Sequence, residues 1–339
     1  SAISSASEFA EDAFGNLVDK MTASSPTVKN DTILTIKACI DTFGGESCLK
    51  HWLPVWNALK FEIMHNTDTE DTPTSSSTEE FNNYQDSLQV LTSISSRLIQ
   101  YEESAFDKFY SHVFDELKPN FTYEKDLKQS CGIFSAIASV NVVTFNKVLS
   151  GVLPLFFENT NDMDVNKQKL LLLNLSFLFE AYTRVFGVTD KKDSKPIVSN
   201  KLADYKDEVL MLLSKALTGT SKAEVTLRTL AVVQFTKLVK MSGYLTREEV
   251  FLTVQYLTEV ILTDGDKNIY CACLEGLKVI SDNYEDIVFE ICLKHMLELL
   301  PEDSTDIIKL NDKEDVPLER ILKVILDFTT SRHKLVKES

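Results

Sequence analysis

The stretch SKAEVTLRTLAVVQFTKLVKMSG, Ser221–Gly243, decides the fold of this chain. At helical spacing it carries two apolar stripes, one made of Leu227, Ala231 and Leu238 and the other of Val225, Val232 and Val239. A helix on the surface of an ordinary globule needs one such stripe, so two stripes predict burial against neighbours on two sides. This pattern is typical of the inner helix of a hairpin that stacks with other hairpins.

A short phrase recurs along the chain: a β-branched residue, a small or polar residue and an aliphatic residue, each four positions apart. Its three copies are Val28, Thr32, Ile36; Val225, Thr229, Val233; and Ile269, Cys273, Leu277. Positions four apart share a helix face, and the small middle residue lets a neighbouring helix come close. The phrase indicates a stacked hairpin repeat of the HEAT type. In the helix that contains the second copy, we also expect the neighbouring Leu230 to lie between stacked helices.

The predicted fold class is therefore all-α, an α-solenoid (a HEAT/armadillo-like superhelix) of about seven stacked helix pairs with no β-sheet, because every periodic segment follows helical spacing. We expect residues 1–339 to form a single continuous solenoid, interrupted by loops at 187–200 and 302–315. The segment 67–78, TDTEDTPTSSST, has no apolar residue and is predicted to be a disordered loop. The chain ends within what looks like a further repeat, so we expect it to be a fragment of a longer solenoid.

The composition disfavours two classes of partner. The net charge is −16 and the sequence pI is about 4.8, whereas a protein that binds nucleic acid normally carries a basic stripe. No apolar run approaches the roughly 18 residues that a membrane-spanning helix needs. We therefore expect no direct nucleic acid and no membrane as partners. The acidity could attract basic proteins, or it could serve only solubility.

No catalytic or phosphate-binding motif is present, since the chain has no GxxxxGK[ST], GxGxxG, GxSxG or HExxH stretch. The adjacent carboxylates of Glu102 and Glu103, and those of Glu248 and Glu249, are better explained as solvated helix faces than as acid–base pairs. We predict that the chain is not an enzyme, with no catalytic residues.

The six cysteines are scattered through helical patterns. Cys48 and His51, and likewise Cys292 and His295, lie one helical turn apart, a spacing that metal sites sometimes use. The two pairs are far apart in the sequence, and Cys271 and Cys273 point to opposite sides of a helix. Cys39 and Cys131 lie on apolar faces, where a thiol is inert. We expect no metal site and no cofactor.

Six long stretches resemble fungal members of one family, the HEAT-repeat scaffold of the cytosolic iron–sulfur assembly (CIA) targeting complex. They are FAEDAFGNLVDKMTASSPTVKNDT (Phe9–Thr32), WNALKFEIM (Trp56–Met64), DELKPNFTYEKDLKQ (Asp115–Gln129), KAEVTLRTLAVVQFTKLVKM (Lys222–Met241), NIYCACLEGLKVIS (Asn268–Ser281) and DFTTSRHKLVKES (Asp327–Ser339). The animal member of this family is named for methyl methanesulfonate sensitivity and the yeast member for methionine auxotrophy. The resemblance covers nearly the whole chain and is weakest at 67–78.

The resemblance implies a non-catalytic adaptor in the cytoplasm and nucleus. It would help deliver iron–sulfur clusters to apo-proteins of DNA replication, repair and transcription, such as DNA helicases and polymerases. Further implied partners are the repair and transcription factor containing the repair helicase, and the other CIA targeting subunits, which dock to a C-terminal region absent here. The chain would be a middle segment of that scaffold. The matched motifs are packing phrases, so they identify no partner-binding residue.

Two other classes remain open. One is a HEAT-repeat transport receptor or another protein–protein scaffold, such as a phosphatase scaffold, and binding of a basic transport signal would reveal a transport receptor. The other is a helical enzyme, which would need a polar pocket that the sequence does not locate.

Overall fold

A computed structural model describes residues 9–22, 25–65, 83–158, 163–190, 199–300, 307–311 and 314–330. The chain divides into two compact units, residues 1–158 and 159–339, which are described separately below. The predicted disordered loop at 67–78 lies outside the described residues, and the single continuous solenoid over 1–339 stays a prediction. Within the described residues, no helix combines the length and the apolar composition that crossing a membrane requires.

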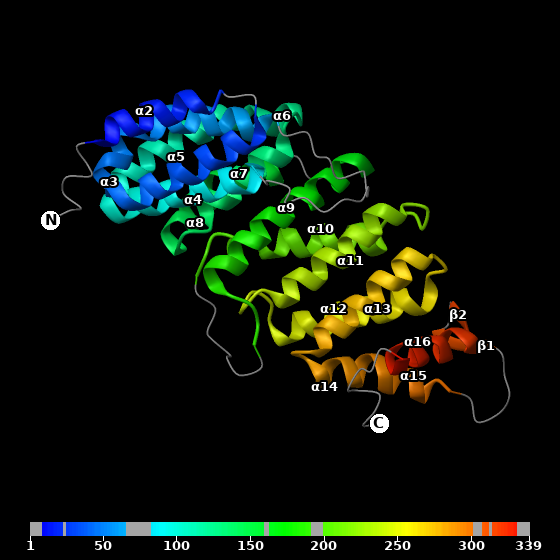
Figure 1. The fold of residues 1–339 in the computed structure, drawn as a ribbon. Coiled ribbons are helices and arrows are strands. Elements are labelled where there is room, and N and C mark those ends of the chain that lie inside the picture. The colour runs from blue at the N-terminus through cyan, green and yellow to red at the C-terminus, as the bar shows by residue number, and fades with distance from the viewer. Residues whose placement is uncertain are drawn as a thin grey trace. The chain divides into compact units, whose positions relative to one another are not determined.

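The first unit consists of helices (Figure 1). In chain order they are α2 (Ala10–Lys20), α3 (Pro26–Met64), α4 (Asn83–Tyr101), α5 (Glu103–Leu117), the short α6 (Pro119–Tyr123), α7 (Leu127–Ala138) and α8 (Val142–Phe157). Their buried side chains are mostly aliphatic and aromatic, as helical periodicity predicts.

The helix α3 is two helices in one run, because Gly44 interrupts it with a φ of 80°. Glycine is suited to this left-handed backbone region because it has no Cβ. Gly45 follows with a different constraint: a Cβ there would lie 2.8 Å from the Arg97 carbonyl oxygen. The break at Gly44 lets the two halves of α3 pack against different helices.

Helices of the first unit alternate between two layers, and successive helices of one layer run parallel. In one layer, Asn30 in the first half of α3 donates to Asp86 at the start of α4 (2.8 Å), and Arg97 near the end of α4 donates to the Asp41 carbonyl (2.8 Å). In the other, the second half of α3 reaches α5 through Trp56 Nε1, which donates to Glu116 (2.9 Å). This alternation is the stacking of helix pairs that defines an α-solenoid.

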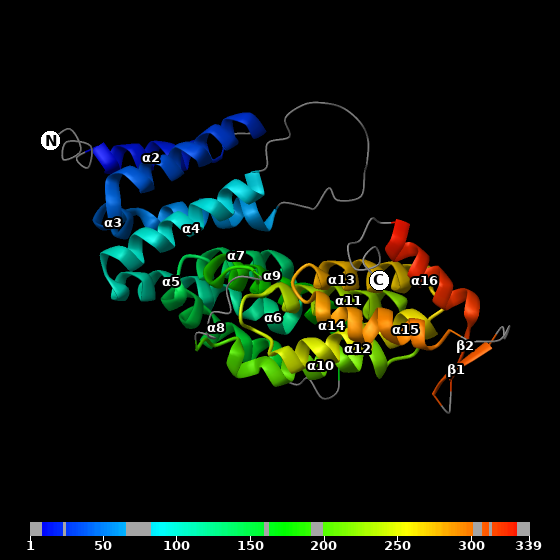
Figure 2. The same cartoon turned by 90° about the horizontal axis from the view of Figure 1, so that it is seen from below.

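The second unit repeats the arrangement (Figure 2). Its helices are α9 (Val165–Phe186), the 3₁₀ turn η3 (Ala203–Tyr205), α10 (Lys206–Thr218), α11 (Val225–Lys240), α12 (Arg247–Thr263), α13 (Lys267–Ser281), α14 (Glu285–Val288), the π-helical η4 (Phe289–Lys294), α15 (His295–Glu298) and α16 (Leu318–Thr330). The helices α14, η4 and α15 form one continuous run, and α10 pairs with α11 as α12 pairs with α13.

Two layers can again be followed by their contacts. One contains α9, α11 and α13: Gln234 donates to the Leu172 carbonyl (3.1 Å), and Gly276 lets α13 approach Thr236 of α11. The other contains α10, α12 and the α14–α15 run, where Lys206 pairs with Glu249 (2.8 Å) and Arg247 pairs with Asp286. The all-α stacked-pair fold predicted from the sequence is therefore confirmed within each unit.

Helix α11 is buried along its two predicted stripes. Leu227, Ala231, Val232, Leu238 and Val239 are buried, and Val225 is half-buried. The recurring phrase was less reliable. Its copies in α3 and α13 are buried except at Val28, but Val233 in α11 is exposed and Thr229 and Leu230 are half-buried. Leu230 therefore does not lie deep between stacked helices, because the buried faces of α11 point toward α9, α10 and α13 instead.

One predicted loop differs from the structure. The segment 302–315 contains most of an antiparallel pair, β1 (Ile307–Asn311) with β2 (Glu314–Pro317), so the prediction of a loop there was wrong at these strands. This two-stranded pair leaves the all-α class unchanged, and the described residues contain no sheet of three or more strands. The β-branched Ile307 and Ile308 favour extended backbone, a signal that the acidic surroundings obscured. In the segment 187–200, Val188 forms an isolated antiparallel bridge with Met241.

A buried ion pair joins four elements of the second unit. Arg228 of α11 pairs with Asp264, which follows α12, and its Nε donates to the Leu217 carbonyl at the end of α10 (3.0 Å). The side chains of Arg228 and Asp264 are only 6% and 4% exposed. From α16, Arg320 donates to the Asp264 and Ile261 carbonyls. Burial alone would raise the pKa of Asp264, but the Asp266 amide and Arg228 outweigh it and hold the pKa below its ordinary value.

We predict that Gly45→Ala lowers the free energy of unfolding by about 1–3 kcal/mol, because the new methyl group meets the Arg97 carbonyl of α4. Gly15→Ala is the matched control. A Cβ at Gly15, within α2, has no neighbour within 4 Å, so this change should be neutral or stabilising by up to about 1 kcal/mol. Urea denaturation of both variants checks this, and equal effects would contradict the close approach of α3 and α4.

We also predict that Arg228→Met destabilises the second unit by about 3–5 kcal/mol at neutral pH, since it leaves the Asp264 carboxylate buried without its partner. Arg247→Met is the control. It removes an ion pair whose side chains are 60% and 65% exposed, and should change stability by no more than about 1 kcal/mol.

This loss should depend on pH in a defined direction. The folded-state pKa of Asp264 is lowered, so its contribution is fully present above its ordinary value of 3.8 and is lost as pH falls through the folded pKa. The cost of Arg228→Met should therefore shrink in acid, and the double variant with Asp264→Asn should be more stable than Arg228→Met alone. A cost that does not vary with pH would contradict the pairing.

Candidate partner-binding surface

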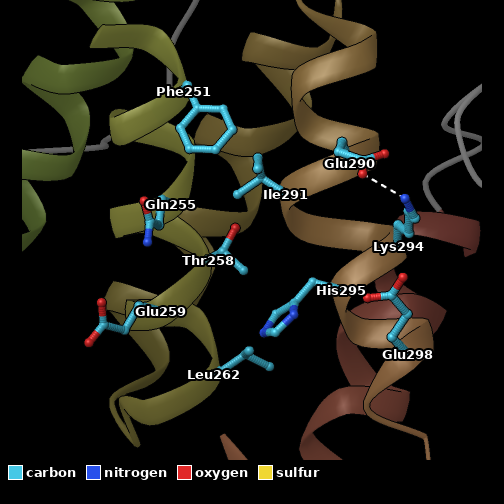
Figure 3. Close-up of a pocket in the computed structure, with 10 residues that line it drawn as sticks. All are labelled: Phe251, Gln255, Thr258, Glu259, Leu262, Glu290, Ile291, Lys294, His295 and Glu298. Atoms are coloured by element: carbon cyan, nitrogen blue, oxygen red, sulfur yellow. Dashed lines mark hydrogen bonds and ion pairs between the residues drawn. The ribbon is translucent and has the colours of Figure 1, made fainter. Parts of the chain in front are cut away.

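A groove runs between α12 and the parallel α14–α15 run of the second unit (Figure 3). Its volume is about 370 Å³. From α12 it is lined by Phe251, Gln255, Thr258, Glu259 and Leu262. From the opposite run it is lined by Glu290, Ile291, Lys294, His295 and Glu298. We call this feature the α12–α15 groove.

The local sequence positions both walls. Helix α12 begins with a capping box in which the Thr246 hydroxyl accepts from the Glu249 amide and the Glu249 carboxylate accepts from the Thr246 amide (2.7 Å). The lining residues of α12 then recur at intervals of three or four, so they share one helix face. The opposite wall contains the π-helical turn η4, and such turns occur frequently at functional sites.

The groove has an apolar middle and charged edges. Figure 3 shows Phe251 and Ile291 facing one another, with Leu262 and His295 opposed farther along. The carboxylates of Glu259, Glu290 and Glu298 lie toward the edges, and Glu290 accepts a hydrogen bond from Lys294 at 2.6 Å. Three carboxylates against one ammonium leave the lining acidic. Such a surface suits a protein segment with apolar and basic side chains.

A second hollow, of about 610 Å³, lies in the first unit between α2 and the second half of α3. Its lining includes Phe14 and Pro54 together with Glu11, Lys50 and His51. The His51 ring stacks on Phe14, with 5.0 Å between ring centroids. It is a wide, mixed surface between two packed helices.

Within each cysteine–histidine pair considered from the sequence, the thiol and the imidazole have different surroundings. Cys48 is buried and points its thiol at the Ile94 carbonyl (4.0 Å), while His51 stacks on Phe14. Cys292 is buried, whereas His295 lines the α12–α15 groove. Among the described residues, no group of three or more His, Cys, Asp or Glu side chains could hold a metal ion.

The adjacent carboxylates serve helix ends and ion pairs. Glu249 caps α12 and pairs with Lys206, and Glu103 pairs with Lys147 at 2.8 Å. Glu102 accepts from Ser104 at 2.5 Å. Asp266 accepts from the amides of Asn268 and Ile269 and so caps α13. These carboxylates have structural partners.

Sequence reasoning identified no residue of the α12–α15 groove as a binding residue. Its walls come from segments about 40 residues apart, so spacing within either segment could not reveal the groove. One signal existed: large apolar residues such as Phe251 and Leu252 lie on the polar side of α12 and are exposed, at 42% and 48%.

The stacked helix pairs place the chain in the class of α-solenoid proteins. A family model described as "Dos2-interacting transcription regulator of RNA-Pol-II" matches residues 1–65. The MMS19 DNA repair/transcription protein of Saccharomyces cerevisiae is 54% identical over the whole of this chain and 34% of its own length. The Schizosaccharomyces pombe "DNA repair/transcription protein mms19" is 27% identical, over 81% of this chain and 27% of its own length. The chain belongs to the MMS19 family of DNA repair/transcription proteins.

More distant relatives agree with this assignment. The human "MMS19 nucleotide excision repair protein homolog" is 25% identical over 81% of this chain and 25% of its own length. The chain spans about a third of the length of the yeast relative. Among solved structures, a mutant of Kap121p aligns with 96% of this chain and 35% of its own, at 10% identity and a TM-score of 0.46. The fold assignment rests on the helix packing described above.

We predict that the thiols differ sharply in reactivity. Burial raises the pKa of Cys48, Cys273 and Cys292 to about 12, and burial raises that of Cys131 as well. The thiolate is the nucleophile, so these four should react with iodoacetamide at pH 8 only when the fold opens. Cys271 is exposed and should be alkylated first.

Timed alkylation with mass spectrometry checks this order, and Cys271→Ser should remove the fastest phase. Cys39, which is half-buried with a raised pKa, should follow more slowly. Rapid alkylation of Cys292 in the folded chain would contradict the packing of η4 against α12.

Proposed function

We propose that this chain is part of a non-catalytic adaptor of cytosolic iron–sulfur protein assembly. The adaptor helps deliver clusters to apo-proteins of DNA replication, repair and transcription. The observation that carries the proposal is 54% identity, over the entire chain, to a DNA repair/transcription protein of the MMS19 family. The CIA role comes from the resemblance of the six stretches quoted above.

The geometry of the helices supports a protein-binding role. Stacked helix pairs expose long, shallow faces that suit the surface of another protein better than a small substrate. The α12–α15 groove is open along its length and lined by both apolar and charged side chains, a mixture found in protein–protein interfaces.

The partners follow from the same proposal. They are apo iron–sulfur proteins such as DNA helicases and polymerases, the factor containing the repair helicase, and the other CIA targeting subunits, which would dock outside this chain. The adaptor would work in the cytoplasm and the nucleus. An acidic chain with a net charge of −16 favours binding these proteins directly and not through nucleic acid.

The second candidate is a transport receptor. The feature that favours it is the acidic lining of the α12–α15 groove, which could receive a basic transport signal. The two candidates differ in their cargo, because a transport receptor binds basic signal peptides whether or not the attached protein has a cluster site.

The proposal is tested with the purified 339-residue chain immobilised on a resin. It should retain an apo-helicase of the iron–sulfur class more strongly than the same helicase loaded with its cluster, because an adaptor releases its client once the cluster is delivered. The chain itself should contain no stoichiometric iron or zinc by elemental analysis. An unrelated acidic helical protein on the same resin controls for charge.

Equal retention of apo- and cluster-loaded helicase would contradict the adaptor role. Retention of a fusion that carries only a basic transport signal, with no retention of the apo-helicase, would favour the transport receptor. A tightly bound cluster in the purified chain, or a turnover activity abolished by one point substitution, would contradict the adaptor role.

A further inference from the structure

The α12–α15 groove follows a seam in which buried residues of η4 pack against α12, but its exposed rim lacks the bridging contacts of the equivalent seams. Between α3 and α5, Trp52 packs edge-on against Phe109, with 5.4 Å between ring centroids. Between α5 and α8, Tyr110 donates to the Val148 carbonyl (3.0 Å), and its hydroxyl and the Phe114 ring fill the space beside Gly151. Between α12 and α14, Arg247 and Asp286 close only the first turn. The rest of that seam has no bridging aromatic pair or ion pair among its ten lining residues.

The π-helical turn η4 (Phe289–Lys294) forms much of the wall opposite α12. Glu290, Ile291 and Lys294 lie within this turn, and His295 begins α15 directly after it. All four line the groove together with Glu298, at spacings that keep them on one side of the run. The run therefore presents a continuous wall to α12 along two turns.

The groove has the size and the polarity of a site for one helix. Its α12 wall runs from Phe251 to Leu262, which is about 16 Å, or three helical turns. Phe251, Leu262 and Ile291 provide an apolar floor. Docking of an amphipathic helix between two parallel helices is a common mode of protein recognition.

The charges at the edges select among possible helices. Glu259 and Glu298 are exposed, one on each wall, and Glu290 forms an ion pair with Lys294. A docked helix with acidic flanks would place like charges together, whereas Lys or Arg flanks would meet carboxylates on both sides. The net charge of −16 adds a long-range attraction for a basic segment.

We propose that the α12–α15 groove binds a basic amphipathic helix of a protein partner. Its apolar face lies between Phe251 and Ile291, and its Lys or Arg side chains pair with Glu259 and Glu298. The inference rests on the proposed function only in assigning the helix to a client or to another partner of the adaptor. The helix belongs to another protein and not to a second copy of this chain.

The test uses the full 339-residue chain and a synthetic helical peptide of about 14 residues, long enough to fill three turns. The peptide carries Leu on one face and Lys on both flanks, with a fluorescent label for anisotropy. It should bind the wild-type chain, and Glu259→Lys combined with Glu298→Lys should weaken binding by at least about tenfold, since two attractions become repulsions. A Glu-flanked peptide should bind this double variant better than it binds the wild type.

The matched control reverses two exposed carboxylates in the other layer, Glu275→Lys with Asp282→Lys, and produces the same change in net charge. It should weaken binding by no more than about threefold, through long-range charge alone. Circular dichroism of both double variants should match the wild type, because all four side chains are exposed. A peptide with Gln in place of Lys should bind more weakly than the Lys peptide.

Several results would overturn the inference: no binding of the Lys peptide, equal losses in the groove and control variants, or equal affinity for the Gln peptide. Sedimentation that shows a dimer dissolved by the groove variant would instead assign the groove to a second copy. Retention of apo-helicase by the resin-bound wild type separates the two proposals. If the helicase is retained but the peptide does not bind, the adaptor role stands and the groove is not a helix-binding site. If the peptide binds but the helicase is not retained, the groove binds a basic helix and the adaptor role is contradicted.

Discussion

The buried ion pair between Arg228 and Asp264 is the interaction on which the second unit depends. It connects the start of α11, the end of α10 and the turn between α12 and α13, and Arg320 adds α16 through the Asp264 carbonyl. A buried charge needs a partner, because the loss of hydration is larger than most single packing contributions. Each of these elements therefore has one permitted position relative to the others, which fixes how neighbouring helix pairs stack.

Elsewhere the stack is held by close packing between helices of the same layer. Gly45 and Gly276 allow backbones to approach, and Tyr110 covers Gly151 at the α5–α8 seam. These contacts close the seams between parallel helices and leave smooth outer faces. In the α12–α15 seam, η4 packs against α12 through buried side chains such as Cys292, and beyond the first turn the groove residues form no aromatic pair or ion pair across the seam. The proposed binding surface thus lies on the one of these seams whose exposed rim is not bridged.

This arrangement fits a protein whose role is recognition. The chain belongs to the MMS19 family, whose yeast members are named as DNA repair/transcription proteins, and it covers about a third of the Saccharomyces cerevisiae relative. In a stack of helix pairs each pair contacts mainly its neighbours, so different stretches can hold different partners without a shared central cavity. The acidic groove would be one such local site, and the wide hollow between α2 and α3 offers a second surface of different character.

The sequence by itself determined the helical class and the two apolar stripes of α11, because both depend on residues close together in the chain. The six long stretches quoted in the sequence analysis also indicated the family. The strand pair at 307–317 was missed because its two short strands lie in an acidic, turn-rich segment without clear alternation. Tertiary structure alone decided the partner of Arg228, the exposure of Val233 and the groove itself. Each of these depends on which faces of helices from separate segments meet. Helical periodicity within one segment shows which face is apolar but not which other segment packs against it.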